Sequence, residues 1–363
     1  MRIPNNILLV FDDFDPVTNY KIRLVEETRK IETINTIIFL YEAFKGQSDR
    51  AFQQDEKVAL LSATLPNTLS PSYIIDGDSF TNTDLTIFQK IQLQKKKYKS
   101  SSLYLLLDTK EYQILEQSSE WPLILTIVNL VVYVLPEHKE LVHTYSFTSK
   151  PIIFINPTDE INALSKASLL EVTKSGFNQT LIDYMNKSDE CAIKRIKSHL
   201  SPERFRHSLR VAGTIKRICE LLEIEDMELR YDSYISALYH DICKEIPRET
   251  QESIAKETLA WDDYISWKVL HGPIGAWYLR NKYLFTNEDI LEAISQHTVP
   301  NDDPKMITIF LFLADKLEPE RQKEYPNIYK DAWDLIERKL PMEAFNFLIS
   351  YFEELKATKN KFQ

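Results

Sequence analysis

The chain has 363 residues, of which 44% are hydrophobic and 27% charged, and its formal net charge is −10. This length suggests two domains of ordinary size, and the composition is that of a globular protein, not of an extended disordered chain. The acidic balance argues against general binding to nucleic acid or to an anionic membrane surface. The chain has only six glycines, which argues strongly against glycine-rich phosphate loops.

The cysteines and the apolar segments indicate a cytoplasmic protein. Cys191, Cys219 and Cys243 form no CxxC pair and no even framework, so we expect reduced thiols. In the N-terminal segment, three acidic residues follow soon after a short apolar run, so the segment is a poor signal peptide. The most apolar stretch, residues 121–136, is too short for a bilayer and is interrupted by Asn129, so we expect buried core there and no membrane contact.

The first half of the chain alternates between short β-branched runs and charged segments of helical character. Residues 20–30 form one such expected helix. The expected strands are residues 7–11, 36–40, 103–108, 130–135 and 151–156. Strands separated by helices indicate βαβ units and a parallel sheet. We therefore expect a Rossmann-like α/β domain at residues 1–186.

The second half changes to helical periodicity. Phe205, Leu209, Ala212 and Ile215 recur at helical spacing, and Ser201-Pro202-Glu203 before them is a good helix start. Further helices are expected at residues 230–245, 262–282, 288–297, 304–317 and 327–356. We therefore expect an all-α domain at residues 187–363, joined to the first domain near residues 185–194.

Imidazoles and carboxylates in separate expected helices form an ordered set in this second domain. The set consists of His207, His240, Asp241, His271, His297 and Asp315. Asp315 ends the very apolar run MITIFLFLAD, so its carboxylate is expected to be partly buried and to need hydrogen bonds, a cation or a metal. A single helical histidine is more often a core or surface residue, and His199 is left in that class. Imidazole and carboxylate together suit iron, manganese or zinc, and the lack of thiolate ligands favours a hydrolytic metal.

The segments around these residues resemble a known family. They are RFRHSLRVA (204–212), LYHDICKE (238–245), HGPIGA (271–276), ISQHT (294–298) and ADKLEPER (314–321). In this order they resemble the HD-domain phosphohydrolases and, more narrowly, the bacterial symmetrical diadenosine tetraphosphate hydrolases of the YqeK type. The resemblance implies a metal-dependent enzyme that releases two ADP from diadenosine tetraphosphate, a small-molecule nucleotide.

The resemblance also implies metal ligands. One ion would be held by His207, His240, Asp241 and Asp315. His271 and His297 would hold a second ion with Asp241 bridging, or would face the substrate phosphates if only one ion binds. Iron is the expected metal, with manganese or zinc as alternatives.

Further residues of these segments are implied to meet the substrate. Asp241 and Lys244 are the expected catalytic residues. Lys244 and Arg321 would bind phosphate oxygens, and Thr298, which follows His297, is expected in the same substrate site. Positive groups there would offset the charge of the phosphate chain.

The segment FDDFDPVTNYKIRLVEE (11–27) resembles the start of the nicotinate-nucleotide adenylyltransferases, G-G-[ST]-F-D-P-x-H-x-G-H. Phe14-Asp15-Pro16 match this pattern, whereas Phe11 and Asp12 replace the two glycines and Asp13 replaces the hydroxyl residue. Thr18 and Lys21 replace the two histidines. The glycines would let the backbone approach a triphosphate, and the new carboxylates would repel it. The resemblance implies an adenylyltransferase fold with a degenerate catalytic motif.

The whole chain thus resembles a fusion of an adenylyltransferase-like domain with an HD domain, an arrangement of mycoplasma-like bacteria. Hydrolysis of a nucleotide by the second domain is the main functional hypothesis. One alternative is nicotinate-nucleotide adenylyltransferase activity, with Lys21 partly replacing a phosphate-binding histidine. Another is that the first domain is a non-catalytic nucleotide-binding scaffold. No feature of the sequence sets an oligomeric state.

Overall fold

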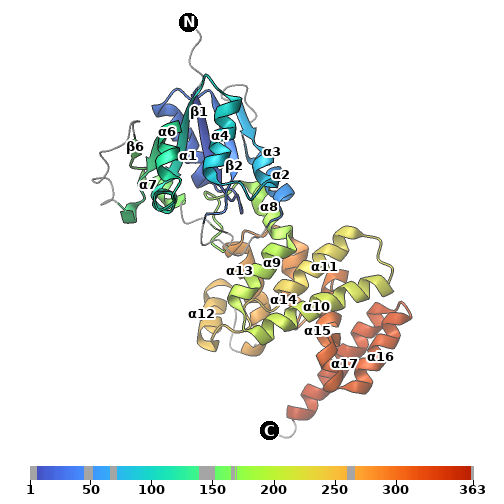
Figure 1. The fold of residues 1–363 in the computed structure, drawn as a ribbon. Helices are drawn as coiled ribbons and strands as arrows, with labels where there is room; N and C mark the ends of the chain where they lie inside the picture. Colours follow the sequence, from blue (N-terminus) through green and yellow to red (C-terminus); the bar gives the residue numbers. More distant parts are fainter. Residues whose placement is uncertain are drawn as a thin grey trace. The chain divides into compact units, whose positions relative to one another are not determined.

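The computed structural model describes residues 6–44, 52–65, 72–138, 152–164, 168, 170–259 and 266–360. The chain divides into two compact units, Met1–Ile182 and Asp183–Gln363, and the division falls within helix α8 (Gln179–Lys187). Figure 1 shows a sheet with helices on its faces in the first unit and a set of packed helices in the second. Among the described residues, no helix combines the length and the apolar character that a membrane span requires.

The first unit is built on a six-stranded parallel sheet with the order β3-β2-β1-β4-β5-β6. The strands are β1 (Asn6–Asp12), β2 (Thr36–Tyr41), β3 (Ser72–Ile75), β4 (Ser102–Asp108), β5 (Val128–Tyr133) and β6 (Ile152–Ile155). This order is that of a doubly wound Rossmann-like sheet, and it reverses between β1 and β4, where such sheets bind ligands at the carboxyl ends of their strands. The expected α/β fold is confirmed.

Seven helices connect or follow these strands in the described part of the first unit. They are α1 (Asn19–Ile31), α2 (Gln54–Thr64), α3 (Gly77–Thr81), α4 (Ile87–Lys97), α5 (Thr109–Glu116), α6 (Trp121–Ile127) and α7 (Asp159–Leu164). The apolar stretch 121–136 is therefore a short helix followed by a central strand. Leu123 in that helix is 49% exposed, so the expectation of buried core was wrong for this residue.

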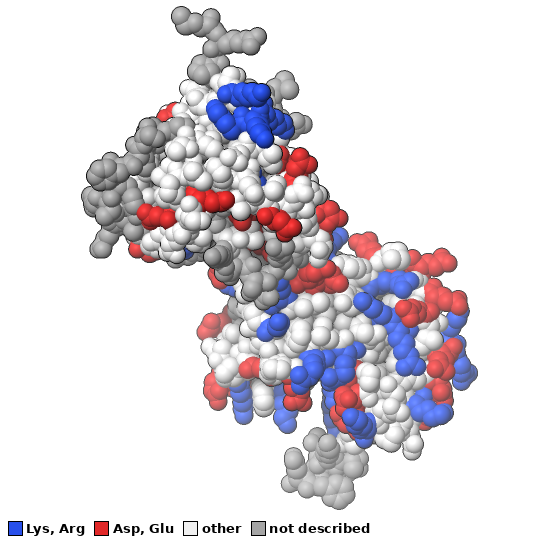
Figure 2. Space-filling view, in the orientation of Figure 1, with Lys and Arg blue, Asp and Glu red and all other residues white. Residues whose placement is uncertain are grey.

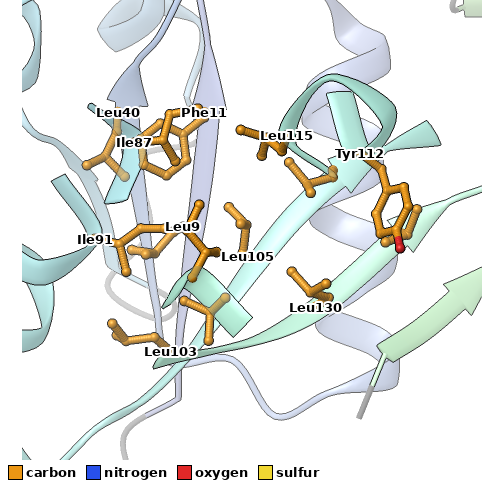
Figure 3. Packing of buried hydrophobic residues seen from close by; sticks show 14 of the residues in the cluster. Leu9, Phe11, Leu40, Ile87, Ile91, Leu103, Leu105, Tyr112, Leu115 and Leu130 are labelled. Carbon is orange, nitrogen blue, oxygen red and sulfur yellow. The ribbon is translucent and has the colours of Figure 1, made fainter. Parts of the chain in front are cut away.

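The core of the first unit lies on both faces of the sheet. Alternate residues of neighbouring strands, such as Leu9, Leu40 and Leu105, point to the face that α4 covers with Ile87 and Ile91, as Figure 3 shows. The intervening strand residues point to the opposite face and are also buried. Because both faces are covered, these strands are continuous apolar runs, which is typical of parallel sheets.

The second unit is a helical domain, also as expected. After α8 come α9 (Asp189–His199), α10 (Pro202–Leu221), α11 (Met227–Tyr239), α12 (Arg248–Thr258), α13 (His271–Lys282), α14 (Glu288–Gln296), α15 (Met306–Leu317), α16 (Pro326–Glu337) and α17 (Pro341–Asn360), with short 3₁₀ turns at Trp267–Val269 and Pro319–Lys323. Ser201 caps α10, since its hydroxyl accepts a hydrogen bond from the Arg204 N–H. Helix α15 is buried almost throughout and packs against α10, α11, α14 and α17.

Several expected boundaries differ from the structure. The helix expected at 327–356 is two helices, because Pro341 cannot continue a helix and Lys339 adopts a positive φ of 62° that ends the first one. The helix expected at 230–245 stops at Tyr239, where the chain enters a turn. In the described part of the helix expected at 262–282, the regular helix begins only at His271.

Three further details were not expected. Leu209, assigned to the apolar face of α10, is 36% exposed. Strand β3 is short and only partly buried, so it carries little apolar signal. Helix α12 has few apolar residues and buries only Gln251 and Ala255, so its periodicity does not stand out in the sequence.

Candidate metal centre

The six expected metal ligands converge from five parts of the second unit. They are His207 on α10, His240 and Asp241 in the turn after α11, His271 at the start of α13, His297 at the end of α14, and Asp315 on α15. Each is at most 6% exposed. The apolar helix α15 packs on all sides, which brings the Asp315 carboxylate into the interior.

The first half of the cluster surrounds one oxygen of Asp241. His207 Nε2 lies 3.8 Å from Asp241 Oδ2 and 3.2 Å from Asp315 Oδ1. His240 Nε2 lies 3.5 Å from the same Asp241 Oδ2 and 3.3 Å from His207 Nε2. His207, His240 and Asp241 form a group whose ligand atoms are close enough to share one metal ion.

The second half surrounds the other oxygen of Asp241. His271 Nε2 lies 3.2 Å and His297 Nε2 3.8 Å from Asp241 Oδ1, and the two nitrogens are 3.1 Å apart. Asp241, His271 and His297 form a second group of potential ligands. The Asp241 carboxylate therefore faces one imidazole pair with each of its oxygens.

Hydrogen bonds at the far side of each ring fix which nitrogen faces inward. His240, His271 and His297 place Nδ1 within 2.7–3.0 Å of the backbone carbonyls of Ala237, Lys268 and Ile294. A carbonyl only accepts, so each of these Nδ1 atoms carries a proton, and Nε2 is the nitrogen that faces the interior of the cluster. His207 Nδ1 lies 3.4 Å from the Glu318 carboxylate. Burial lowers the pKa of His207, but Asp315 and Glu318 outweigh it and raise the pKa above its ordinary value.

This arrangement places the Nε2 atoms of two neighbouring rings against each other in each half of the cluster. The Nε2–Nε2 distances are 3.3 Å for His207 with His240 and 3.1 Å for His271 with His297. In the neutral rings of His271 and His297, two Nε2 lone pairs at this distance repel unless a cation lies between them. Two nitrogens each ~2.1 Å from one ion would lie about 3.0–3.4 Å apart at right or tetrahedral angles. The residues present thus fit a divalent metal ion.

The electrostatics of the carboxylates agree with a site for a cation. Burial raises the pKa of Asp241, but the His240 and His271 rings outweigh it and hold the pKa well below its ordinary value. Burial likewise raises the pKa of Asp315, but Lys316 and His207 outweigh it and hold this pKa well below its ordinary value as well. Both groups are therefore ionised at neutral pH.

Burial of the second imidazole pair keeps it neutral. The pKa of His297 is well below its ordinary value because the ring is buried and lies near His271 and His240. Burial also lowers the pKa of His271. A neutral imidazole is the form that binds a metal.

The expected substrate residues lie at the edge of this centre. Lys244 Nζ lies 3.1 Å from His271 Nε2, and burial lowers the pKa of this lysine. Arg321 Nη2 lies 3.8 Å from Asp315 Oδ1. Thr298 directly follows His297 and lines a cavity together with Arg321.

Four residues at the centre were not expected from the sequence. Arg204 Nη1 contacts Asp241 Oδ2 at 3.0 Å, and Lys316 Nζ contacts Asp315 Oδ2 at 2.6 Å. The Glu318 carboxylate, beside His207, accepts a 2.7 Å hydrogen bond from Arg210 Nε. Each lies within five residues of an expected ligand in the sequence, and this proximity was the only sign in the sequence that it could belong to the centre. Which of them would face the centre depends on helix geometry that spacing alone does not give.

Histidine His199 lies outside the cluster, as expected. Its Nδ1 lies 2.9 Å from the Arg195 carbonyl and its Nε2 2.7 Å from the Tyr278 hydroxyl. These hydrogen bonds account for the presence of His199 as a structural residue. The three cysteines are buried and form no disulfide.

In the first unit, aspartate side chains of the loop after β1 accept hydrogen bonds from the backbone N–H groups of the same loop. Asp12 Oδ1 accepts hydrogen bonds from the backbone N–H groups of Asp13 at 2.8 Å and Phe14 at 3.4 Å. Asp13 Oδ1 accepts one from the Asp15 N–H at 3.3 Å. Backbone N–H groups that could face a phosphate in a glycine-rich loop are therefore already bound to carboxyl oxygens of the same loop.

Lys21 is likewise engaged within the first unit. Its ammonium lies 2.5 Å from Glu111 Oε1 and 3.6 Å from Asp12 Oδ2, and its side chain is 5% exposed. Burial lowers the pKa of Lys21, but Glu111 and Asp12 outweigh it and raise the pKa above the ordinary value. The charge of Lys21 therefore compensates two carboxylates of the fold.

Comparisons with known proteins agree with both parts. Residues 204–320 match the HD domain family. The chain is 25% identical to the "Probable nicotinate-nucleotide adenylyltransferase/Ap4A hydrolase" of Mycoplasma genitalium, over 88% of this chain and 89% of that protein. A protein of the same name from Mycoplasma pneumoniae is 34% identical over 36% of each chain. The symmetrical bis(5'-nucleosyl)-tetraphosphatase of Halalkalibacterium halodurans is 28% identical over 38% of this chain and 72% of that protein.

These similarities confirm the resemblance to the fused arrangement, and they extend through both units for the Mycoplasma genitalium protein. The similarity to the tetraphosphatase covers a smaller share of this chain. The HD match begins at Arg204 and ends at Glu320, so it encloses all six clustered residues. Residues 204–320 form an HD domain, and the second unit of this chain is a metal-dependent phosphohydrolase of the HD type.

Proposed function

We propose that this protein hydrolyses diadenosine tetraphosphate symmetrically into two ADP at the cluster around Asp241. The single observation that carries the proposal is the arrangement of four imidazoles that turn Nδ1 toward a carbonyl or carboxylate oxygen and Nε2 toward the interior of the cluster, on both sides of one carboxylate. The tetraphosphatase and the mycoplasma proteins named above are similar over this part of the chain and support the choice of substrate.

We propose that the cluster holds one or two divalent ions, and that iron is the metal, with manganese and zinc as the alternatives to test. His207, His240, Asp241 and Asp315 would hold the first ion, and His271, His297 and the second oxygen of Asp241 the other. Nitrogen and carboxylate oxygen ligands in this ratio suit these metals. When bound, the ion supplies Lewis acidity and a water that ionises near neutral pH.

The chain's own residues would hold and orient the phosphate chain. Lys244 lies near His271, and Arg321 lies near Asp315. Both cations would bind phosphate oxygens. The Thr298 hydroxyl can donate to a further oxygen. Arg204 contacts Asp241, and the Asp241 carboxylate would hold the two imidazole pairs in position on either side of it.

The reaction balances as a hydrolysis. The oxygen of one water adds to the second phosphorus of the tetraphosphate, and the bond from that phosphorus to the central bridging oxygen breaks. The bridging oxygen leaves with the other ADP, and one proton passes to solvent. Cationic side chains at the central bridge stabilise the charge that develops there.

The test pairs a metal measurement with product analysis. Asp241→Asn keeps the side-chain shape but removes the charge shared by the two groups, so we expect loss of bound metal and of ADP formation. Glu245 lies in the same turn, where its carboxylate accepts hydrogen bonds from Ser201, and Glu245→Gln serves as the control. The proposal fails if Asp241→Asn retains both metal content and hydrolysis.

We also propose that the first unit does not transfer adenylyl groups and acts as a scaffold or nucleotide-binding domain. The mycoplasma relatives carry the name of a nicotinate-nucleotide adenylyltransferase, so the activity needs its own test. The proposal is supported by the engaged state of Lys21 and of the loop after β1. Pyrophosphate release from ATP and nicotinate mononucleotide at high protein concentration would contradict it.

A further inference from the structure

A cavity of about 520 Å³ lies in the second unit beside the metal centre. Cavities of about 300–1,000 Å³ are typical of small-molecule sites. Part of its wall comes from helix α17, whose residues lie beyond the end of the HD match at residue 320. In Figure 1, α15, α16 and α17 pack together in this region, and α17 contacts both of the others.

One end of the cavity reaches the metal centre. Thr298 follows His297, and Val269 lies two residues before His271. Two cations complete this end, because Lys316 Nζ lies 2.6 Å from Asp315 Oδ2 and Arg321 Nη2 lies 3.8 Å from Asp315 Oδ1. Arg321 Nη1 also lies 2.8 Å from Glu324 Oε1, so a phosphate group attracted by these two cations would compete with Glu324 for the guanidinium.

Four aromatic side chains belong to the rest of the wall. Phe312 and Phe345 meet edge to face with ring centroids 5.1 Å apart, and Tyr325 and Phe352 do so at 5.6 Å. Lys316 links the two ends of the cavity, since its ammonium also lies 5.6 Å from the Phe312 ring centroid and 5.8 Å from that of Phe352. Aromatic side chains of this kind stack on nucleobases irrespective of the base.

We infer that this cavity binds one nucleoside of the nucleotide substrate, with the base against the aromatic wall and the first phosphates at Lys316 and Arg321. The inference rests on the proposed function for its substrate class and extends it to a site that includes α17. The polarity follows from the charges: the two cations beside Asp315 mark the phosphate end, and the Phe345 and Phe352 rings of α17 mark the base end.

The test compares two probes on the full-length, Mn²⁺-loaded protein by calorimetry. ADP carries a nucleoside and phosphates, whereas tripolyphosphate carries phosphates alone. Asn346→Trp fills the cavity from an exposed position of its wall, and Phe352→Ala removes part of the aromatic wall. Leu355→Ala is the control, since Leu355 lies on the same helix, is 39% exposed and is not part of the wall.

We expect both wall variants to weaken ADP binding about tenfold and to leave tripolyphosphate binding within about twofold of the original protein. The control should change neither. Asn346→Trp keeps the test decisive if Phe352→Ala lowers the melting temperature, because it removes no buried group. Unchanged ADP affinity in both wall variants would overturn the inference, as would an equal loss for ADP and tripolyphosphate or no ADP binding to the original protein.

The inference and the proposed function fail separately. If the wall variants bind ADP as the original protein does while Asp241→Asn abolishes hydrolysis, the nucleoside site is wrong and the proposed function stands. If ADP binding depends on the wall but diadenosine tetraphosphate is not cleaved, the nucleoside site stands and the substrate assignment is wrong.

Discussion

Gly272 gives the sharpest prediction about the metal centre, because it lets the start of α13 pack directly on the end of α14. A Cβ at this position would lie 2.9 Å from the Ser295 carbonyl oxygen, 3.0 Å from that of Ile294 and 3.3 Å from His297 Nδ1. The Ile294 carbonyl is the acceptor that fixes the His297 ring. Gly272→Ala therefore presses on the backbone and on the hydrogen bond that hold one expected ligand.

The magnitude follows from the nature of the contact. The neighbours are backbone atoms of a packed helix and cannot move independently, so we expect the overpacking penalty of about 1–3 kcal/mol. We also expect metal affinity to fall by about 10–100-fold, as when a group that orients a ligand is disturbed. Gly213 is the matched control: a Cβ there meets nothing within 4 Å, and alanine should stabilise helix α10 by roughly 0.5–1 kcal/mol.

The assay is thermal unfolding with and without added Mn²⁺, together with a metal titration of each variant. We expect the two substitutions to have opposite signs in stability, and only Gly272→Ala to weaken metal binding. Equal behaviour of Gly272→Ala and Gly213→Ala would refute the argument that close packing of α13 on α14 positions His297.

Three other substitutions test separate parts of the structure. Glu318→Gln removes the buried charge that holds His207 Nδ1, so metal affinity should fall about 10–100-fold in a metal titration, with exposed Glu320→Gln as the unchanged control. Lys21→Met leaves buried carboxylates uncompensated in the first unit, which should cost about 3–5 kcal/mol in denaturant unfolding while hydrolysis persists. Burial and the neighbouring Asp12 raise the pKa of Asp13 from 3.8 to about 7. The folded protein thus binds this proton more tightly than the unfolded chain and loses stability as the pH rises through that interval. Asp13→Asn should therefore raise the melting temperature at pH 8 and leave it unchanged at pH 3.5.

Each of these expectations can fail on its own. The positioning role of Glu318 is wrong if metal affinity is unchanged or if Glu320→Gln weakens it equally. A stable Lys21→Met variant would mean that its carboxylate neighbours need no cation. An equal gain from Asp13→Asn at both pH values would show that the gain does not come from the proton on that carboxyl group.

The order of the metal-centre residues could be read from the sequence, but their geometry could not. A carboxylate after the apolar run of α15 and histidines in separate helices predicted a buried cluster, and Asp315 and His207 are indeed 3.2 Å apart. The two-sided position of Asp241 between imidazole pairs depends on the turn after Tyr239, whereas a continuous helix was expected there. Side-chain direction in such a turn is set by tertiary packing.

The fold was predictable where the periodicity was strong. The buried strands of the parallel sheet are continuous apolar runs and were found, whereas β3 at the edge is half exposed and was missed. The break at Lys339 was signalled only by Pro341, which can also begin a helix, and here it begins α17. The degenerate motif of the first domain was visible, but the pairing of Lys21 with Glu111 joins residues 90 positions apart and needed the structure.

The most direct test of the central claim is to incubate diadenosine tetraphosphate with the metal-depleted protein, and with the same protein after Fe²⁺, Mn²⁺ or Zn²⁺ is restored, and to analyse the products. We expect no turnover after chelation, and two ADP per substrate once metal is returned. Undiminished hydrolysis after complete removal of metal, or no product with any of the three candidate metals, would contradict it.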